Sequence, residues 1–193
     1  MKLLIAVFLA GFSVLGVCRA DGKPTSRSEN KTSKVITDFI KGDNFNGWHV
    51  EDDAVMGGKS QGSLTIIKDG HALFSGKISL ENGGGFSSVQ SYFEPIDVSS
   101  YSKALLRIKG DGKRYFFRVQ STLRDRHSYV FPFDTTGQWQ TVEIPFDQMY
   151  AKWRGNRLKL PNYPGQTMAH ARFLIANDKP ETFELLIGSI SLK

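Results

Sequence analysis

Three consecutive glycines at positions 83–85 stand between two strand-like runs, residues 72–80 and 86–93. Such a run excludes a helix and makes a poor strand interior, because glycine loses the most backbone freedom on ordering. It therefore marks a turn with positive φ, or a place where a second backbone or a ligand comes close. A second glycine-containing loop, residues 52–60, has a similar character. We predict that these two loops pack together at one edge of a β-sandwich.

Short strand-like runs with turn residues between them continue along nearly the whole chain. The expected strands cover residues 45–50, 63–68, 71–80, 86–93, 104–108, 115–121, 128–133, 139–144, 171–176 and 182–192. Roughly ten short strands, with turn signals every 8–12 residues and very little helix, predict an all-β fold of two stacked sheets or a barrel.

Four local features refine this fold prediction. Residues 110–112, Gly-Asp-Gly, are typical of a tight hairpin turn. In the strand 115–121, Tyr115, Phe117 and Val119 share one face and Phe116, Arg118 and Gln120 share the other. A turn or two of helix is plausible only within residues 147–160, around Gln148. Gly188 lies inside the last strand and predicts a β-bulge.

The N-terminal residues 1–20 are predicted to be a secretory signal peptide. Lys2 supplies the positive start, an uncharged apolar run follows, and Ala20 is a small residue suited to a cleavage site. Lipid modification of Cys18 and an uncleaved anchor are alternatives, whereas a mitochondrial transit peptide should be amphipathic and Arg-rich. We therefore expect a flexible lead-in at 21–36, an ordered domain at 37–193, and a secreted or periplasmic location.

Signal cleavage would change the chemistry available to the mature chain. It removes Cys18, the single cysteine, so no disulfide or thiolate site is expected. It also removes Lys2 and Arg19, which lowers the formal charge from +6 to +4. The remaining charges are scattered along the sequence, which argues against nucleic acid as a partner. No membrane span is expected after cleavage, and no cofactor is predicted.

Asp52 and Asp53 are adjacent carboxylates and therefore candidates for chemistry. On a strand they would point to opposite faces, which makes them a poor acid–base pair. We interpret one of them as a structural acceptor for the backbone N–H groups of the Gly57-Gly58 turn. Contact with a ligand or with Ca²⁺ is the alternative, since loop carbonyls can complete a set of oxygen ligands.

The histidines do not have the spacing of a metal site, so no metal ligand is predicted. His49 lies near the two aspartates, and a triad with Ser60 can be drawn. The surrounding residues lack a nucleophile-elbow motif, however, and the glycine spacing near Ser60 does not make a phosphate loop. We predict no catalytic residue; a hydrolase using Asp52 or Asp53 with His49 is the less favoured alternative.

Arg118 and Gln120 share one strand face with Phe116 and form a second candidate site. With Tyr129 or Trp139 they could line a shallow groove, because sugar-binding surfaces combine aromatic faces with planar polar donors. Cross-strand pairing with acidic side chains is the alternative reading of the same residues.

Several short motifs occur in a fixed order over about residues 37–193. They are Trp48 with Asp53, Met56-Gly57-Gly58-Lys59-Ser60, Phe74-Ser75-Gly76, Asn82-Gly83-Gly84-Gly85-Phe86-Ser87-Ser88-Val89, Gly110-Asp111-Gly112-Lys113-Arg114-Tyr115, Trp139-Gln140 and Ile144-Pro145-Phe146. Taken together they resemble the CIA30 domain, named for the complex I intermediate-associated protein. The resemblance implies a galactose-binding-like jelly-roll sandwich and a non-enzymatic role in assembly of respiratory complex I.

These observations favour a non-enzymatic binding or assembly module. Its partner is expected to be a protein of the secretory or cell-envelope compartment, with a carbohydrate as the alternative ligand. The residues expected to contact a ligand or to shape its loops are Trp48, Asp52, Asp53, Gly57, Gly58, Ser60, Asn82, Gly84, Ser87, Arg118 and Gln120.

Overall fold

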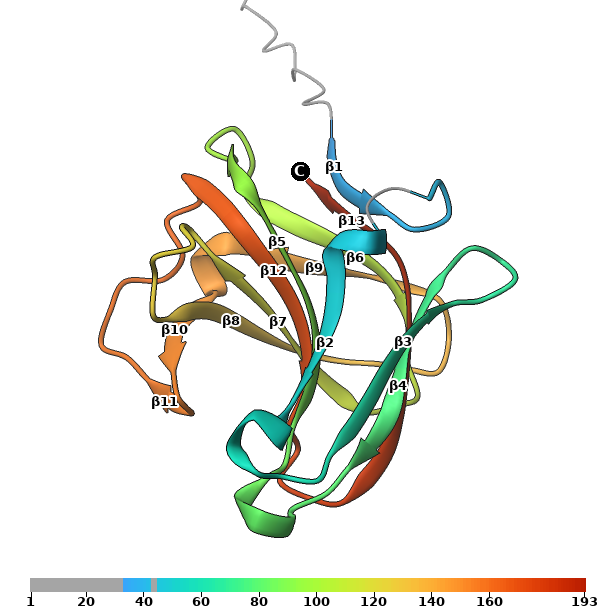
Figure 1. Ribbon diagram of the computed structural model, residues 1–193. Coiled ribbons are helices and arrows are strands. Elements are labelled where there is room, and N and C mark those ends of the chain that lie inside the picture. Colours follow the sequence, from blue (N-terminus) through green and yellow to red (C-terminus); the bar gives the residue numbers. More distant parts are fainter. Residues whose placement is uncertain (1–32, 43–44) are drawn as a thin grey trace, which may run out of the picture. The chain divides into compact units, whose positions relative to one another are not determined.

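Two antiparallel β-sheets stack face to face in the computed structural model (Figure 1), which describes residues 33–42 and 45–193. The six-stranded sheet has the order β3-β4-β13-β6-β9, and β1 also pairs with β13. Its strands are β1 (Lys34–Asp38), β3 (Gln61–Ile66), β4 (Ala72–Ile78), β6 (Lys103–Lys109), β9 (Gln140–Pro145) and β13 (Glu181–Leu192).

The second sheet has seven strands in the order β11-β10-β8-β7-β12-β5-β2. Its strands are β2 (Trp48–Asp52), β5 (Ser87–Asp97), β7 (Arg114–Gln120), β8 (Ser128–Asp134), β10 (Tyr150–Trp153), β11 (Asn156–Arg157) and β12 (Thr167–Ile175). The helical segments are single 3₁₀ turns: η1 (Phe45–Gly47), η2 (Asp53–Met56), η3 (Glu81–Gly83) and η4 (Phe146–Gln148). The all-β sandwich prediction is therefore confirmed, with thirteen strands in the described residues instead of about ten.

The core lies between the sheets and is built from alternate residues of each strand. On β7, Tyr115, Phe117 and Val119 share one face, as the alternating pattern predicted, and are fully buried. Across the core, Phe74 and Phe183 are also buried, with ring centroids 4.7 Å apart. Because side chains alternate between faces, every second residue of the seven-stranded sheet points away from the core.

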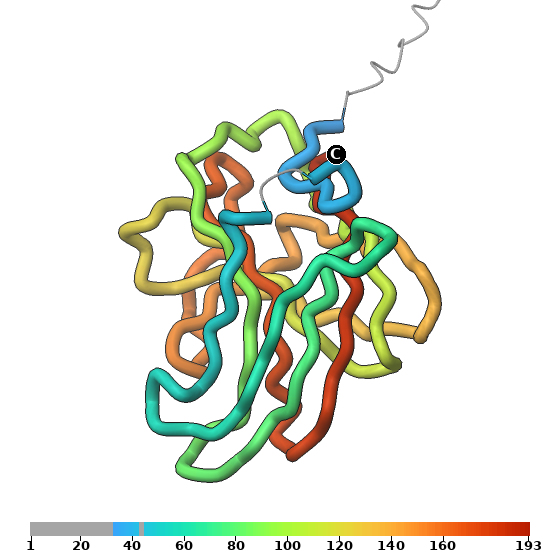
Figure 2. The backbone as a smooth tube through the Cα atoms, turned by 45° about the vertical axis from the view of Figure 1, so that its right-hand side comes forward, coloured from blue at the N-terminus to red at the C-terminus, as the bar shows by residue number. Residues whose placement is uncertain are grey.

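The two glycine-rich loops lie side by side at one end of the sandwich, as predicted. Figure 2 shows the segment after β2 and the segment between β4 and β5 running together at the lower end of the molecule. Close to these loops, the backbones of β3 and β4 lie unusually near each other. A Cβ on Gly76 would lie 2.1 Å from the backbone oxygen of Gln61. Only glycine allows β3 and β4 to approach so closely at this point.

Three local predictions differ from the structure. The Gly-Asp-Gly turn 110–112 joins β6 to β7, which belong to different sheets, so it is a crossover and not a hairpin. The single turn η4 confirms the helical turn expected around Gln148, but η1, η2 and η3 lie outside the one region where helix was expected. The lead-in was expected to reach residue 36, but β1 begins at Lys34 and pairs with β13. The bulge at Gly188 is confirmed by a register shift between β13 and β6.

Candidate functional site

A row of side chains crosses the outer face of the seven-stranded sheet, on the side away from the core. Strand register places one residue from each of six neighbouring strands in this row: His49, Gln90, Arg172, Arg118, Val130 and Tyr150. The rows on either side contribute, among others, Glu51, Tyr92, His170 and Phe116. We call these ten residues the outer polar face.

Gln90 is the centre of a hydrogen-bond network on this face and is 1% exposed. Its Oε1 accepts from Arg172 Nε at 2.7 Å and lies 3.1 Å from His170 Nε2. Its Nε2 donates to Glu51 Oε2 at 2.8 Å and lies 3.2 Å from His49 Nε2. Since the amide oxygen can only accept, the network assigns the His170 proton to Nε2.

Arg172 also forms an ion pair with Glu51, so both charges of this pair are satisfied. Arg118 is different, because its neighbours in the row are the buried Val130 and the cationic Arg172. Its Nε atom is buried without a hydrogen-bond partner, and the described residues provide no ion pair for its guanidinium. Burial first, and then the charge of Arg172, lower the pKa of Arg118 to about 10. The folded protein therefore disfavours the charged form of the Arg118 side chain.

Two histidines enclose Tyr92, which is 47% exposed. Its ring stacks on His170 at a centroid distance of 4.5 Å and on His49 at 5.7 Å. Burial, followed by the charge of Arg172, lowers the pKa of His170 to about 3. His170 is therefore neutral at physiological pH, and its buried Nδ1 has no hydrogen-bond partner.

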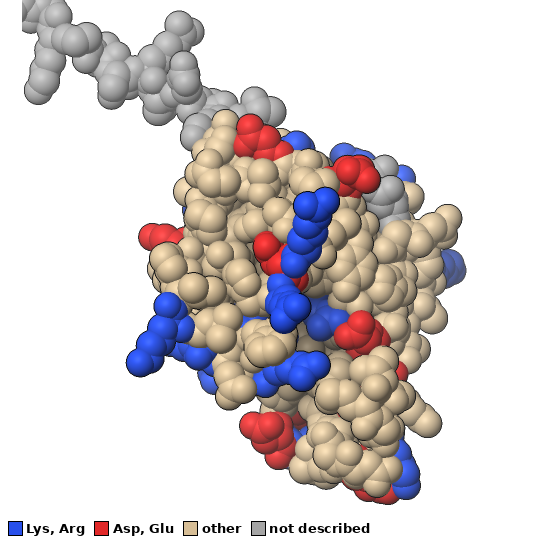
Figure 3. Space-filling model, turned by 60° about the vertical axis from the view of Figure 1, so that its left-hand side comes forward, with Lys and Arg blue, Asp and Glu red and all other residues tan. Residues whose placement is uncertain are grey.

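The other half of the face combines aromatic rings with cations. The guanidinium of Arg157 lies 4.6 Å from the centroid of the Tyr150 ring, and Lys152 Nζ lies 5.9 Å from that of Phe116. Burial first, and then Arg118, lower the pKa of Lys152. Figure 3 views the molecule from the side of β10 and β11 and shows lysines and arginines gathered across the middle of it.

Asp53 forms a separate cluster at the end of the sandwich and is fully buried. Its Oδ1 accepts from the backbone N of Ser60 at 2.9 Å. Its Oδ2 accepts from Ser60 Oγ at 2.5 Å, from Gly85 N at 2.6 Å and from Phe86 N at 3.2 Å. Burial opposes ionisation, but these hydrogen bonds outweigh it and lower the pKa of Asp53. The carboxylate thus ties together the two glycine-rich loops.

Glycines make room for this carboxylate. A Cβ on Gly58 would lie 2.3 Å from Asp53 Oδ1, and one on Gly84 would lie 2.6 Å from Oδ2. Asn82 adds a second link, since its Nδ2 donates to the carbonyl of Gly57 at 3.0 Å. The expected structural acceptor is therefore Asp53, but its backbone donors lie in other residues than the Gly57-Gly58 pair. We call Asp53, Gly58, Ser60, Asn82 and Gly84 the loop clamp.

Three further candidates do not belong to the outer polar face; Trp48 and Ser87 are buried, and Asp52 is partly buried. Trp48 is 6% exposed and packs between Phe39 and Phe173. Asp52 accepts from the backbone N of Gly62 at 2.9 Å. Ser87 is fully buried, and its Oγ has no partner in the described residues.

The proposed groove around Arg118 does not form as expected. Tyr129 pairs in register with Val119 and faces inward. There its ring packs on Tyr163, with the two ring centroids 5.1 Å apart. Trp139 directly precedes β9 of the six-stranded sheet, and its ring centroid lies 4.4 Å from that of His71. These two aromatic residues therefore do not line a surface with Arg118.

Gln120 has a structural role on the same strand. Its Nε2 donates to the backbone carbonyl of Asp125 at 2.8 Å and lies 3.4 Å from that of His127. The amide thus holds the loop between β7 and β8. Of the two residues predicted on this strand, only Arg118 has no hydrogen-bond or ion-pair partner within the described part of the chain.

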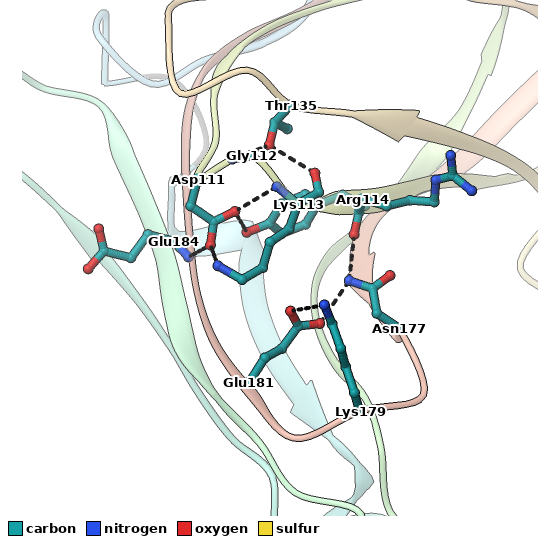
Figure 4. Close-up of polar contacts among 10 residues, drawn as sticks. Asp111, Gly112, Lys113, Arg114, Thr135, Asn177, Lys179, Glu181 and Glu184 are labelled. Carbon is teal, nitrogen blue, oxygen red and sulfur yellow. Dashed lines mark hydrogen bonds and ion pairs between the residues drawn. The ribbon is translucent and has the colours of Figure 1, made fainter.

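The crossover turn is also held by its own contacts, as Figure 4 shows. Asp111 accepts from Lys113 Nζ at 2.6 Å, from Tyr115 Oη at 3.0 Å and from Glu184 N at 3.0 Å. Thr135 Oγ1 accepts from Gly112 N at 3.0 Å. This motif therefore stabilises the passage of the chain between the two sheets.

Comparison with known families places these features in context. The family model described as complex I intermediate-associated protein 30 (CIA30) matches residues 37–187. The chain belongs to the CIA30 family. A mouse member, the mitochondrial complex I intermediate-associated protein 30, is 25% identical over 157 residues. That match covers 70% of this chain and 48% of the mouse protein, so the chain spans about half of that relative's length.

Solved structures confirm the jelly-roll fold of this CIA30 chain. A family 11 carbohydrate-binding module from Clostridium thermocellum, in complex with a β-1,3-1,4-mixed-linked tetrasaccharide, superposes with a TM-score of 0.59. It is 19% identical, and the match covers 83% of this chain and 94% of that one. An exo-β-agarase matches with a TM-score of 0.51 and 12% identity, covering 83% of this chain and 24% of the enzyme.

The predicted secreted or periplasmic location is wrong, because the curated CIA30 relative is a mitochondrial protein. That prediction depended on residues 1–20, which lie outside both the described residues and the matched region. The proposed lipidation of Cys18 lies outside the described residues as well. Within the described part of the chain, no helix is long and apolar enough to cross a membrane.

Most of the outer polar face of this CIA30 chain was missed from the sequence. The strand was expected to begin at Ala171, which left His170 outside it, whereas β12 begins at Thr167. The alternation of His170 and Arg172 with buried apolar residues was the available signal. Glu51 and Gln90 lie far apart in sequence, and only the strand order brings them together.

Proposed function

We propose that this CIA30 chain is a non-enzymatic binding module that holds a protein partner on its outer polar face during assembly of complex I. The observation that carries this proposal is Arg118, a largely buried cation with an unpartnered Nε in the middle of the sheet. A group that serves only stability would be paired, because an unpaired buried charge costs free energy. Family membership supports complex I assembly as the setting.

The arrangement of the acidic and imidazole groups supports a role without catalysis. His49 lies on the outer face of β2, whereas Asp53 is buried four residues later in the loop clamp. Four residues of strand span about 13 Å, which is far beyond hydrogen-bond reach. The described residues also contain no group of three or more His, Cys, Asp or Glu side chains that could hold a metal.

The aromatic rings favour a protein partner over a carbohydrate. Sugars bind by stacking on an open aromatic face, but the Tyr92 ring is already stacked with the rings of His49 and His170. Tyr150 is covered by the Arg157 guanidinium, 4.6 Å from its ring centroid. Neither tyrosine of the outer polar face therefore offers the bare platform that neutral sugars use.

Site-specific crosslinking tests this function. The photoreactive amino acid p-benzoylphenylalanine replaces Tyr92, which is exposed on the outer polar face. A matched variant carries it at Thr141, an exposed position of β9 in the other sheet. We expect crosslinks from position 92 to a complex I subunit or assembly intermediate in mitochondria, and none from position 141.

Equal crosslinking from the two positions would contradict the assignment of this face. A glycan array that returns a specific sugar, with binding lost when Tyr92 is replaced by alanine, would favour the carbohydrate alternative instead. Turnover of a substrate that is lost in an Asp53→Ala, His49→Ala chain with an intact fold would contradict the non-enzymatic proposal.

A further inference from the structure

We propose that the partner presents a carboxylate to Arg118, so that the outer polar face recognises an acidic peptide segment. This inference rests on the proposed function and adds the chemical class of the group that is bound. Arg118 is the anchor, and the adjoining Tyr150 and Lys152 flank it on the side of β10.

The charges on the face are unbalanced around Arg118. Its cationic surroundings are Arg172 on the adjacent strand and Lys152 on β10. Glu51 is the one carboxylate among the ten residues of the outer polar face, and it is committed to Arg172 and Gln90. An added anion would therefore meet an unneutralised guanidinium that is already partly desolvated, where a charge-assisted hydrogen bond is strongest.

The geometry of the guanidinium fits a carboxylate. Arginine presents its N–H groups as a rigid planar fork that matches two carboxylate oxygens. The Arg118 side chain is only partly buried, and its Nε has no hydrogen-bond partner in the described residues. Gln90 fixes Arg172 through a hydrogen bond of 2.7 Å, so the neighbouring cation stays in place when a ligand arrives. Preorganised donors lose little conformational entropy on binding.

The apolar neighbours favour a peptide over a nucleic acid. Beside Arg118 lie Val130, which is fully buried, and Phe116, which is partly buried. A phosphate backbone needs a stripe of exposed cations with regular spacing, whereas here Arg172 is already paired with Glu51 and the Nε of Arg118 is buried. In a peptide, an acidic residue would pair with Arg118, and an adjacent apolar residue would pack on the exposed part of Phe116.

Fluorescence polarisation with the purified full chain tests this inference. The probes are a labelled peptide with Glu between apolar residues and the same peptide with Gln, both with amidated C-termini. We expect the Glu peptide to bind at least ten-fold more tightly and its binding to weaken as salt is added. A free C-terminal carboxylate on the Gln peptide then shows whether a chain end can replace the Glu side chain.

Two arginines of β7 provide the matched variants. Arg118→Gln is expected to reduce binding of the Glu peptide at least ten-fold. Arg114→Gln removes the same charge from the same strand, but at an exposed site already paired with Asp134, and should change binding less than two-fold. Unchanged circular dichroism spectra confirm that both variants fold.

Equal binding of the Glu and Gln peptides, or full binding by Arg118→Gln, would overturn the carboxylate proposal. Tighter binding of single-stranded RNA with the same dependence on Arg118 would also overturn it. If crosslinking from position 92 still captures a complex I protein in either case, the proposed function stands and only the recognised chemistry is wrong.

Discussion

At the scale of single residues, Arg118 is held in a setting that disfavours its charge, and its removal should stabilise the unliganded protein. Replacing Arg118 by methionine keeps much of the apolar stem and removes the buried cation beside Arg172. We expect a gain of roughly 1–2 kcal/mol in the free energy of unfolding, or about 2–8 °C in Tm. Arg114→Met on the same strand should change stability by less than about 0.5 kcal/mol. A lower Tm for Arg118→Met would show that the cation is structural.

Asp53 is expected to behave in the opposite way, because its carboxylate accepts four hydrogen bonds in the loop clamp. Asp53→Asn places an amide N–H₂ against backbone donors and should cost about 2–4 kcal/mol in urea unfolding. The pKa of Asp53 is lowered from 3.8, so its contribution is complete above that value and is lost as the pH falls below it. If Asp53→Asn keeps the stability of the parent above pH 5, the clamp is not stabilising.

His170 should make stability depend on pH in a higher range. Its pKa falls from 6.5 to about 3 in the folded protein, because it is buried and close to Arg172, His49 and Arg118. Between these two pKa values His170 is protonated in the unfolded chain but not in the folded protein. The free energy of unfolding therefore decreases as the pH falls from 6.5 towards 3. The steepest slope from one such group is about 1.4 kcal/mol per pH unit.

Chemical denaturation at several pH values measures this slope. His170→Gln should flatten the profile between pH 6 and 4 by up to one proton, while Glu51 and the other groups of the network remain. A profile identical to that of the parent would mean that His170 titrates normally in the folded state.

At the scale of elements, the loop clamp depends on glycine for space and not only for backbone freedom. Gly84 has an ordinary φ of −67°, so Gly84→Ala tests crowding, first against Asp53 and then against the backbone oxygen of Ser79, which would lie 2.9 Å from the new Cβ. We expect a loss of about 2–3 kcal/mol, which should shrink in the Asp53→Ala background, where the carboxylate is gone. Gly83 has a φ of +72° and open space around it, so Gly83→Ala should cost only about 1 kcal/mol. Additive effects of Gly84→Ala and Asp53→Ala in thermal unfolding would contradict this account.

The elements also show what the sequence can and cannot reveal. Period-two patterns located most strands, and the shared face of the β7 core residues followed directly from them. The sequence at 110–112 is typical of a hairpin turn. Its contacts to β13, however, accompany the passage of the chain into the other sheet. Which sheet a strand joins depends on packing between distant segments, and no local pattern records it.

At the scale of the whole molecule, the same limit explains the candidate site. The sequence analysis selected glycines, aspartates and Trp48 as candidates for ligand contact. In the structure they form the loop clamp or pack in the core. The outer polar face consists of ordinary residues such as Gln90 and Arg172, which become a network only when β5 and β12 pair. Of the residues singled out from the sequence, His49 lies beside Gln90 in that network, and Arg118 lies next to Arg172 without a hydrogen bond of its own in the described residues.

The division between a binding face and a structural clamp is tested most directly by measuring the affinity of two variants for the partner identified by crosslinking. One chain carries Arg118→Gln and Lys152→Gln, and the other carries Gly84→Ala, at a temperature where both are folded. We predict that the first loses at least ten-fold in Kd and that the second binds as the parent does. Normal binding by the first variant and lost binding by the second would contradict the account.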